Sequence, residues 1–310
     1  MPITYPPAAP TLSGDFVTIS RFLQNPPLVG RRLQEILAYR FLSERLMTRR
    51  LQVAGGAITW EAGGEGIFAN DDPRTVAPGS EYPLTTVGLG QAQLAKTVKY
   101  GQDSIITDES IKRQMLDPVE RTLLKMANSQ VRYVDGIVLS AAVSAITSTQ
   151  AVGGGVWATA TAENILKDVA TAKAAIINVK EGYDPDLIIV DELTYCQVWA
   201  KFLVAGLFPR EGNNPLGSDS GTGFPTVDGI TWLPTPNLPI ANAALLIDTS
   251  VFGGVADEDI GGPGYASAGV GGQVKTMRLD ETDGWRVRLR RTFVPVVLEP
   301  LAARKITGVS

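Results

Sequence analysis

The clearest hydrophobic pattern in the chain is a long amphipathic segment that begins at Pro118 and continues to about Ile146. Apolar residues recur there at steps of three and four, which is the spacing of one helix face, and polar residues fill the opposite face. Asp117, Pro118 and Glu120 match the N-cap, the first helical position and the capping-box partner of a helix start. At about 1.5 Å per residue, such a helix is roughly 43 Å long and spans a whole domain.

This pattern assigns most residues of the predicted helix to one of two faces. A long core helix in an α/β enzyme would have the same pattern, so the helix alone leaves the class of protein open. The predicted exposed positions are Arg121, Lys125, Asn128, Arg132 and Asp135. The predicted buried positions are Val119, Leu123, Ala127, Val131, Val134, Val138, Ala142 and Ala145.

The first part of the chain predicts an extended arm followed by one helix. Residues 1–24 are rich in proline and show no hydrophobic period, which is typical of a segment that packs on something other than itself. Asn25, Pro26 and Pro27 then open a helix. Residues 1–50 carry seven arginines against three acidic residues, a net charge of +4. The apolar stripe of the helix consists of Val29, Leu33, Ile36, Leu37 and Phe41.

Two predicted strands flank an unusually long polar loop. Ile58 and Trp60 alternate with polar residues, and a return strand is expected at residues 94–101. Residues 62–93 contain six glycines and three prolines and almost no hydrophobic period. Such a long loop is uncommon within a compact domain and usually has a function of its own. Residues 51–92 carry one arginine against five acidic residues, a net charge of −4.

The opposite charges of the arm and the loop predict a contact between neighbouring subunits. The simpler alternative is that the two charges are unrelated and that water solvates both segments. The residues predicted for the subunit interface are Arg31, Arg32, Arg49, Arg50, Glu61, Glu65, Asp71, Asp72, Arg74 and Glu81.

The second half of the chain predicts an α/β module. A Gly-rich break at residues 151–160 precedes a helix that Thr161 caps. A continuous apolar strand, Leu187–Val190, follows this helix, and Asp191 caps the next helix, which extends to about residue 204. In the last long strand Trp285, Val287 and Leu289 alternate with arginines, before a run that is expected to be buried. Other predicted elements are a short helix at 108–115, strands at 230–233, 244–247 and 274–279, and this buried run at 293–298.

Composition excludes several classes of protein. With 310 residues, 44% of them hydrophobic, the chain is long enough to bury a large core and to form two subdomains. It contains no histidine, which removes the commonest general base and metal ligand. Cys196 is the single cysteine, so no intrachain disulfide can form, and its apolar helical context predicts a buried position. No run is apolar enough to span a membrane and no signal peptide is recognisable, so we expect a cytoplasmic protein.

No motif for a catalytic, cofactor or metal site emerges from the sequence. The run 217–221 resembles a hydrolase nucleophile turn, but Asp219 occupies its centre and no histidine exists to activate a serine. The Gly-rich run 261–272 lacks the glycine spacing of nucleotide-binding loops. The acidic residues at 71–72 and 257–259 lack the ordered pattern of a calcium loop. We therefore expect no enzyme activity, no cofactor and no metal.

The order of these segments resembles that of the major capsid protein of tailed bacteriophages, whose fold is shared with encapsulins and the herpesvirus capsid floor. The stretches DPDLIIVDELTYCQVWAKFL and GFPTVDGITWLPTPNLP are similar to the axial domain of that family. The resemblance covers nearly the whole chain and includes no short diagnostic motif. It implies an α+β fold with an N-terminal arm and helix (1–50), an extended β-hairpin loop (51–103), a peripheral domain with a long spine helix (104–155), an axial α/β domain (156–275) and a strand that returns to the peripheral domain (276–310).

The same resemblance implies a structural subunit of hexamers and pentamers in an icosahedral head around double-stranded DNA, assembled in the bacterial host cytoplasm. The extended loop of one subunit would lie over the peripheral domain of its neighbour. Besides other copies of the chain, the implied partners are a separate scaffolding protein, a portal, a decoration protein and DNA. The net charge of −4 limits DNA to few nonspecific contacts. No membrane contact is expected.

Some members of that family crosslink their shells through a lysine on the extended loop. Residues 51–95 contain no lysine, so we expect a shell without covalent crosslinks. Two alternatives stay open at this point. An encapsulin would share the fold but enclose an enzyme that carries a docking peptide. A soluble α/β enzyme would need acidic residues that converge in a pocket, whereas the acidic residues of this chain are scattered.

Overall fold

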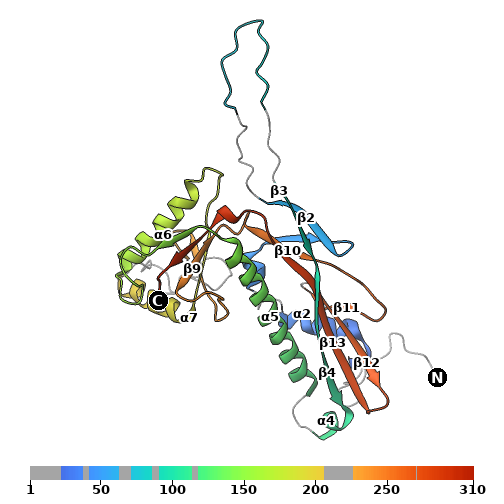
Figure 1. The fold of residues 1–310 in the computed structure, drawn as a ribbon. Coiled ribbons are helices and arrows are strands. Elements are labelled where there is room, and N and C mark those ends of the chain that lie inside the picture. The colour runs from blue at the N-terminus through green and yellow to red at the C-terminus, as the bar shows by residue number, and fades with distance from the viewer. Residues whose placement is uncertain are drawn as a thin grey trace, which may run out of the picture.

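The computed structural model describes residues 22–37, 42–62, 71–85, 91–113, 118–205, 226–269 and 271–310. Residues 1–21 of the expected arm (1–24) and the expected N-cap, Asp117, lie outside these residues, and residues 22–24 are helical where an extended arm was expected. The described chain contains two six-stranded sheets, a long helix beside the first sheet and a two-stranded hairpin that leads into a projecting loop (Figure 1). The mixture of sheets and helices is the predicted α+β class.

The first sheet is organised around one long strand, β13 (Gly284–Val297). One edge of β13 pairs with β12 over residues 284–291 and with β10 over residues 293–297, and the other edge pairs with β4 over residues 284–293. All three neighbours run antiparallel to β13, so a single strand connects most of the sheet. The remaining strands are β1 (Arg49–Gln52), β4 (Val98–Thr107), β10 (Gly253–Asp257), β11 (Ala266–Ser267) and β12 (Gly272–Leu279).

The second sheet has two covered faces. Alternate residues of β6 (Leu187–Val190) enter different cores: Ile188 packs with the helices α6 (Ala162–Ile177) and α7 (Glu192–Val204), and Ile189 belongs to the core of the first sheet. A strand covered on both faces is expected to be continuously apolar, as β6 is. The strand order is β5-β14-β9-β6-β8-β7. The other strands are β5 (Thr149–Ala151), β7 (Thr226–Val227), β8 (Ile230–Pro234), β9 (Ala243–Ile247) and β14 (Ala303–Thr307), the last preceded by the 3-10 turn η1 (Pro300–Ala302).

The long helix α5 (Pro118–Ala145) confirms the predicted strut, with 28 residues that start at Pro118. It lies beside the first sheet and contacts β13, β4 and the helix α2 (Pro26–Leu37) (Figure 1). Six of the eight predicted buried positions are buried, whereas Val131 and Ala145 are only half-buried. The prediction of an exposed Asp135 is wrong, because this side chain is buried with 4% of its surface exposed. Two further apolar residues, Met126 and Leu139, widen the buried face.

Several strand boundaries differ from the prediction. The expected return strand at 94–101 is two strands: β3 (Gln91–Lys96) pairs with β2 (Ala57–Ala62), and β4 starts at Val98 and pairs with β13. Strands β10, β11 and β12, which begin within the expected axial domain (156–275), belong to the first sheet. Strand β14, which lies in the expected return segment (276–310), belongs to the second sheet. The reason is long-range pairing, since a strand's partner is not encoded in its own hydrophobic period.

Two further local predictions need correction. The short helix α4 spans Asp108–Arg113, and residues 114–117 lie outside the described chain. The run at 293–298 is only partly buried: Phe293 and Val296 are buried, whereas residues 294, 295, 297 and 298 are partly exposed, because the core around Val296 is small.

We predict that the two adjacent leucines of α5 differ sharply in their contribution to stability. Leu123 is fully buried, whereas 40% of Leu124 is exposed. Leu123→Ala should lower the free energy of unfolding by about 2–5 kcal/mol, and Leu124→Ala by less than about 1 kcal/mol, because only the first leaves a cavity. Urea unfolding of the unassembled protein measures both values. Equal losses would contradict the assignment of the buried face.

Candidate subunit interface

The most exposed described segment belongs to the loop that connects β2 to β3. Residues 71–85 project away from both sheets, and all but Val76 are classed as exposed (Figure 1). Two large apolar side chains lie on this segment, Tyr82 with 80% and Leu84 with 94% of the surface exposed. Large apolar side chains gain free energy when they leave water, so a segment that exposes them this fully favours contact with another molecule.

The base of this projection is held firmly to the first sheet. Glu258 accepts a hydrogen bond from the Gly56 backbone N–H (2.9 Å) and one from the Thr97 hydroxyl (2.5 Å), so one carboxylate joins both ends of the hairpin. Ile58 and Trp60 pack against Val296, and the Trp60 indole N–H donates to a backbone carbonyl of β13. The hairpin therefore positions the loop from a fixed base.

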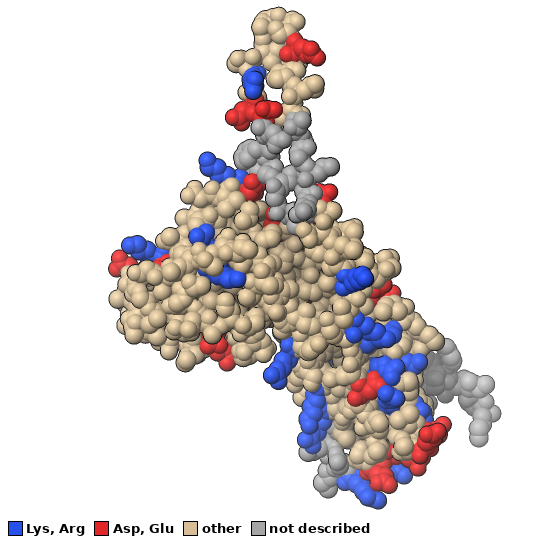
Figure 2. All heavy atoms as spheres, viewed as in Figure 1, with Lys and Arg blue, Asp and Glu red and all other residues tan. Residues whose placement is uncertain are grey.

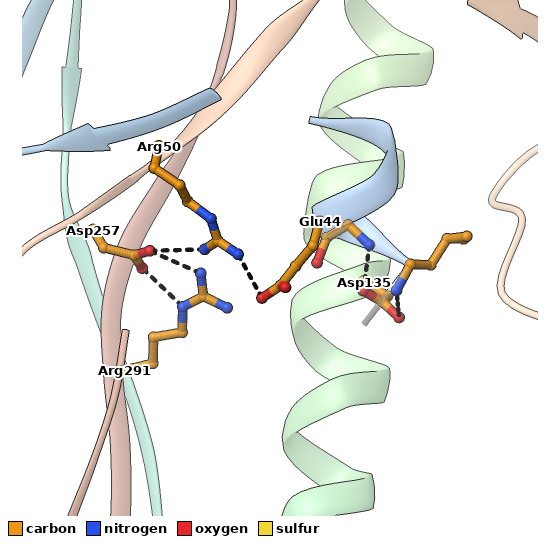
Figure 3. Close-up of polar contacts among 7 residues, drawn as sticks. Glu44, Arg50, Asp135, Asp257 and Arg291 are labelled. Atoms are coloured by element: carbon orange, nitrogen blue, oxygen red, sulfur yellow. Dashed lines mark hydrogen bonds and ion pairs between the residues drawn. The ribbon is translucent and has the colours of Figure 1, made fainter. Parts of the chain in front are cut away.

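A network of charged residues joins the strands of the first sheet to the short helix α3 (Ser43–Leu46) (Figure 3). Arg291 of β13 donates from Nε (2.8 Å) and Nη2 (3.0 Å) to the two carboxylate oxygens of Asp257 on β10. Arg50 lies 3.4 Å from Asp257 and 2.6 Å from Glu44. Only 1% of the Arg291 side chain is exposed, so its charge serves the interior of this chain.

Asp135 attaches the middle of α5 to α3. Its carboxylate accepts hydrogen bonds from the backbone N–H groups of Ser43 (2.9 Å) and Leu42 (3.2 Å), at the start of α3 (Figure 3). The N–H groups of a first helical turn have no partner within the helix, and an acidic side chain satisfies them. Burial raises the pKa of Asp135, although these hydrogen bonds oppose the shift.

The arginines of β13 that point away from the core are also used within the chain. Arg288 binds Asp103 of β4 through two hydrogen bonds of 2.8 Å, and Arg286 binds the same carboxylate. The hydrogen bond from Arg288 is the main cause that holds the pKa of Asp103 below its usual value. Arg290 lies 3.5 Å from the centre of the Tyr265 ring. The alternation predicted for this strand is confirmed, and each arginine of its basic face has a partner within the chain.

The structure separates the predicted interface residues into two groups. Three arginines contact their own chain: Arg32 binds Glu120 (2.7 Å) and Glu35 (2.9 Å), Arg50 binds as described above, and Arg49 donates to a backbone carbonyl. In the second group Arg74 lies 4.0 Å from Asp71, and Glu65 lies outside the described residues. Every described member of the set is exposed, including Arg32, Arg49 and Arg50, and the members outside the first group are Arg31, Glu61, Asp71, Asp72, Arg74 and Glu81.

Helix α7 carries an exposed apolar face that the sequence prediction missed. Cys196 was expected in the core but is exposed. Leu193 (64% exposed) and Val204 (90% exposed) lie on the same side of the helix, because they are 11 positions apart, which is close to three full turns, and Cys196 and Ala200 lie between them on that side. The opposite side, with Val198 and Phe202, fills the core. Apolar residues on both sides of α7 are the signal that could have indicated a second contact, because a helix that is apolar all round is usually covered all round.

Comparison with known proteins identifies the class of this chain. A family model described as phage capsid protein matches residues 90–306, more than half of the sequence. The chain belongs to the phage capsid protein family. This capsid protein matches no curated protein sequence. Membership in the family indicates a structural protein of the virion rather than an enzyme, and it identifies the chain as a major capsid protein that associates with copies of itself.

Solved structures show the same fold for the capsid protein. The capsid structure of the cyanophage P-SCSP1u has a TM-score of 0.63 and 12% sequence identity, over 86% of this chain and 88% of that chain. The mature capsid of bacteriophage PhiM1 has a TM-score of 0.60 and 9% identity, over 87% of each chain. The SrpI encapsulin from Synechococcus elongatus PCC 7942 has a TM-score of 0.59 and 13% identity, over 88% of this chain and 90% of that chain. The fold expected from the order of the segments is therefore confirmed.

Other kinds of site are not apparent in the described part of the capsid protein. Its described residues contain no group of three or more acidic or cysteine side chains placed to hold a metal ion. Among the same residues, no helix is both long enough and apolar enough to span a bilayer.

We predict that Glu258 controls the stability of the hairpin that carries the loop. Glu258→Ala removes the acceptor of two hydrogen bonds and leaves the Gly56 N–H without its acceptor, which typically costs about 1–3 kcal/mol. Amide hydrogen exchange should become faster in β2 and β3 while α5 is unaffected. The control is Glu281→Ala, an exposed carboxylate on the turn before β13. Unchanged exchange in β2 and β3 would show that Glu258 does not hold the base.

We also predict that Asp135 makes the free energy of unfolding depend on pH, because its pKa is higher in the folded protein than in the unfolded chain. The folded protein holds the Asp135 proton more tightly than the unfolded chain does, so this group's contribution to the free energy of unfolding decreases as pH rises from the unfolded pKa through the folded pKa. The difference in unfolding free energy between wild type and Asp135→Asn, measured by urea titration at several pH values, should decrease over that window. A difference that does not change with pH would contradict the raised pKa.

Proposed function

We propose that this major capsid protein forms the hexamers and pentamers of an icosahedral phage head that encloses double-stranded DNA. Assembly takes place in the cytoplasm of the bacterial host, with a separate scaffolding protein, a portal and a decoration protein as partners. The exposed residues of the predicted interface contribute to contacts between subunits. The observation that carries the proposal is the loop at 71–85, which exposes Tyr82 and Leu84 and is held by a hairpin fixed to the first sheet.

The loop supports a shell because nearly all its described residues, 71–85, are exposed in the single chain. A subunit that presents such a loop on one side offers it to an adjacent copy, and repeated head-to-tail contacts of this kind close into rings. Interfaces in permanent assemblies bury roughly 2,000 Å² or more, and a projecting loop supplies much area for few residues. The loop stem described at residues 91–96 carries Lys96 at its end, and the segment 51–95 has no lysine, which supports a shell without lysine crosslinks.

The assembly proposal predicts a strong effect of the most exposed apolar residue of the loop. Leu84→Ser should remove about 1.5–3 kcal/mol from each contact that buries the leucine, which raises the concentration needed for assembly more than about tenfold. Leu84→Met retains an apolar side chain of similar size and should assemble like the wild type. The stability of the unassembled subunit should be equal in all three proteins, because the wild-type leucine is 94% exposed.

Electron microscopy and size-exclusion chromatography of the chain, expressed alone and with a scaffolding protein, measure assembly directly. Closed shells, or rings of five and six subunits, are the expected result. A monomer under all conditions would overturn the proposal. Shells that contain a packaged enzyme in place of nucleic acid would identify an encapsulin, whose fold this chain also shares.

A further inference from the structure

Three cationic side chains form a straight row on the solvent side of α5. Arg121, Lys125 and Arg132 are all exposed. At about 100° per residue they fall within roughly 40° of one another around the helix axis, and at about 1.5 Å per residue the row is roughly 16 Å long. None of the three has a hydrogen bond or ion pair to another described residue. Figure 2 shows basic side chains along the flank of the lower lobe, where α5 runs.

The acidic residues of the same helix do not neutralise this row. Helix α5 contains two of them, Glu120 and Asp135. Glu120 binds Arg32 of α2 at 2.7 Å, and Asp135 is buried against the backbone N–H groups at the start of α3. The sequence suggested a mixed polar face that included Asp135, and burial of that carboxylate leaves the exposed side of the helix cationic.

The row differs in this respect from the other basic groups that the sequence singled out. The arginines of β13 bind Asp103, Asp257 and the Tyr265 ring, as described above. Arg32 of α2 and Arg50 of β1 bind glutamate or aspartate side chains. A guanidinium group that already binds a carboxylate gains little free energy from a second anion. The row on α5 is therefore a better surface for binding an anion than the paired arginines are.

Hydroxyl groups lie next to the row in an open groove along α5. Ser129, Tyr133, Ser140 and Ser144 line this groove together with Arg132. The Tyr133 side chain is 55% exposed, and its ring makes an edge contact with Tyr100 of β4 at 5.2 Å between centroids. Arginine, lysine, serine and tyrosine side chains are the groups that typically contact the sugar-phosphate backbone of nucleic acids.

We propose that the row Arg121, Lys125 and Arg132 binds the phosphate backbone of the packaged DNA, so that this side of α5 faces the interior of the shell. The inference rests on the proposed function and specifies which residues contact the nucleic acid. The binding is independent of sequence, because a row of charges on a helix surface reads phosphates and no base edges.

The acidic loop of a neighbouring subunit is a less suitable partner for the row. The cores of protein interfaces are depleted of charged residues, and the loop presents Tyr82 and Leu84, which need an apolar recess. The row offers three charged side chains, and the groove beside it combines Arg132 and four hydroxyl groups with the apolar side chains Ile137 and Ala141. DNA needs no apolar recess for contacts to its backbone.

The number of charges sets the size of the expected effect. Three phosphate contacts give a slope of about −2.7 for log K against log salt concentration, so binding should weaken about 40-fold between about 50 and 200 mM salt. This modest contribution agrees with a chain whose net charge is −4, and it allows DNA to move within the shell during packaging.

The test measures binding of the unassembled full-length protein to a short random-sequence DNA duplex by fluorescence anisotropy over a series of salt concentrations. The variant is Arg121→Gln, Lys125→Gln and Arg132→Gln combined. One control, Arg121→Lys with Arg132→Lys, retains the charge of the row. A second control, Lys167→Gln, Lys180→Gln and Lys305→Gln, removes the same total charge from α6, the residues after it and β14.

The expected result is a loss of about tenfold or more in affinity and a salt slope close to zero for the row variant, with both controls close to wild type. Equal binding by the row variant and the wild type would overturn the inference, as would equal losses in the row variant and the second control. Electron microscopy of the same proteins separates this result from the proposed function. If the row variant fails to assemble but still binds DNA, the row is a contact between subunits and the inference is wrong.

Discussion

Strand β13 and its packing against α5 form the interaction on which the rest of the structure depends. The backbone of β13 pairs with three antiparallel strands, and alternate side chains, Val287 and Leu289 among them, enter the core that contains Val134 and Val138 of α5. The helix can be 28 residues long because this face is covered by the sheet over much of its length. Arg291 then connects the same strand to β10 through Asp257, next to Arg50 and Glu44.

This arrangement explains how the chain presents a long loop in a fixed position. The β2–β3 hairpin is attached to the end of β13 through Trp60 and to the residue after β10 through Glu258. The attachment is made at the base, and residues 71–85 project away from both sheets with nearly all their side chains exposed (Figure 1). For a capsid subunit this division is useful, because a firm base determines the direction of the loop and an exposed tip retains its apolar side chains for a neighbour.

The electrostatics of the protein follow a similar division. Most arginines of the first sheet form ion pairs with acidic residues on adjacent strands, and these ion pairs connect the strands of the sheet. The cationic row on α5 is exposed by contrast, and Asp135, which follows it in sequence, is removed from the surface by the N–H groups of α3. An acidic protein can thus carry a local cationic surface, since net charge does not describe the distribution of charge.

The sequence by itself determined the elements that have a strong internal period or a specific end signal. The helix from Pro118, the helices capped by Thr161 and Asp191, the apolar strand Leu187–Val190 and the alternation at Trp285, Val287 and Leu289 were all predictable from neighbouring residues. The order of these elements was sufficient to predict the family.

Only the tertiary structure decided which face of each helix is buried and which charged residues form ion pairs. Asp135 looked exposed because the helical period assigns it to the polar side, and only the position of α3 buries it. Cys196 looked buried because α7 is apolar on both sides, and the sequence does not state which side meets the sheet. The division of the return strand at Thr97 and the partners of the arginines have the same origin. Periodicity and charge counts describe one segment at a time, whereas burial and ion pairing depend on residues that are distant in the chain.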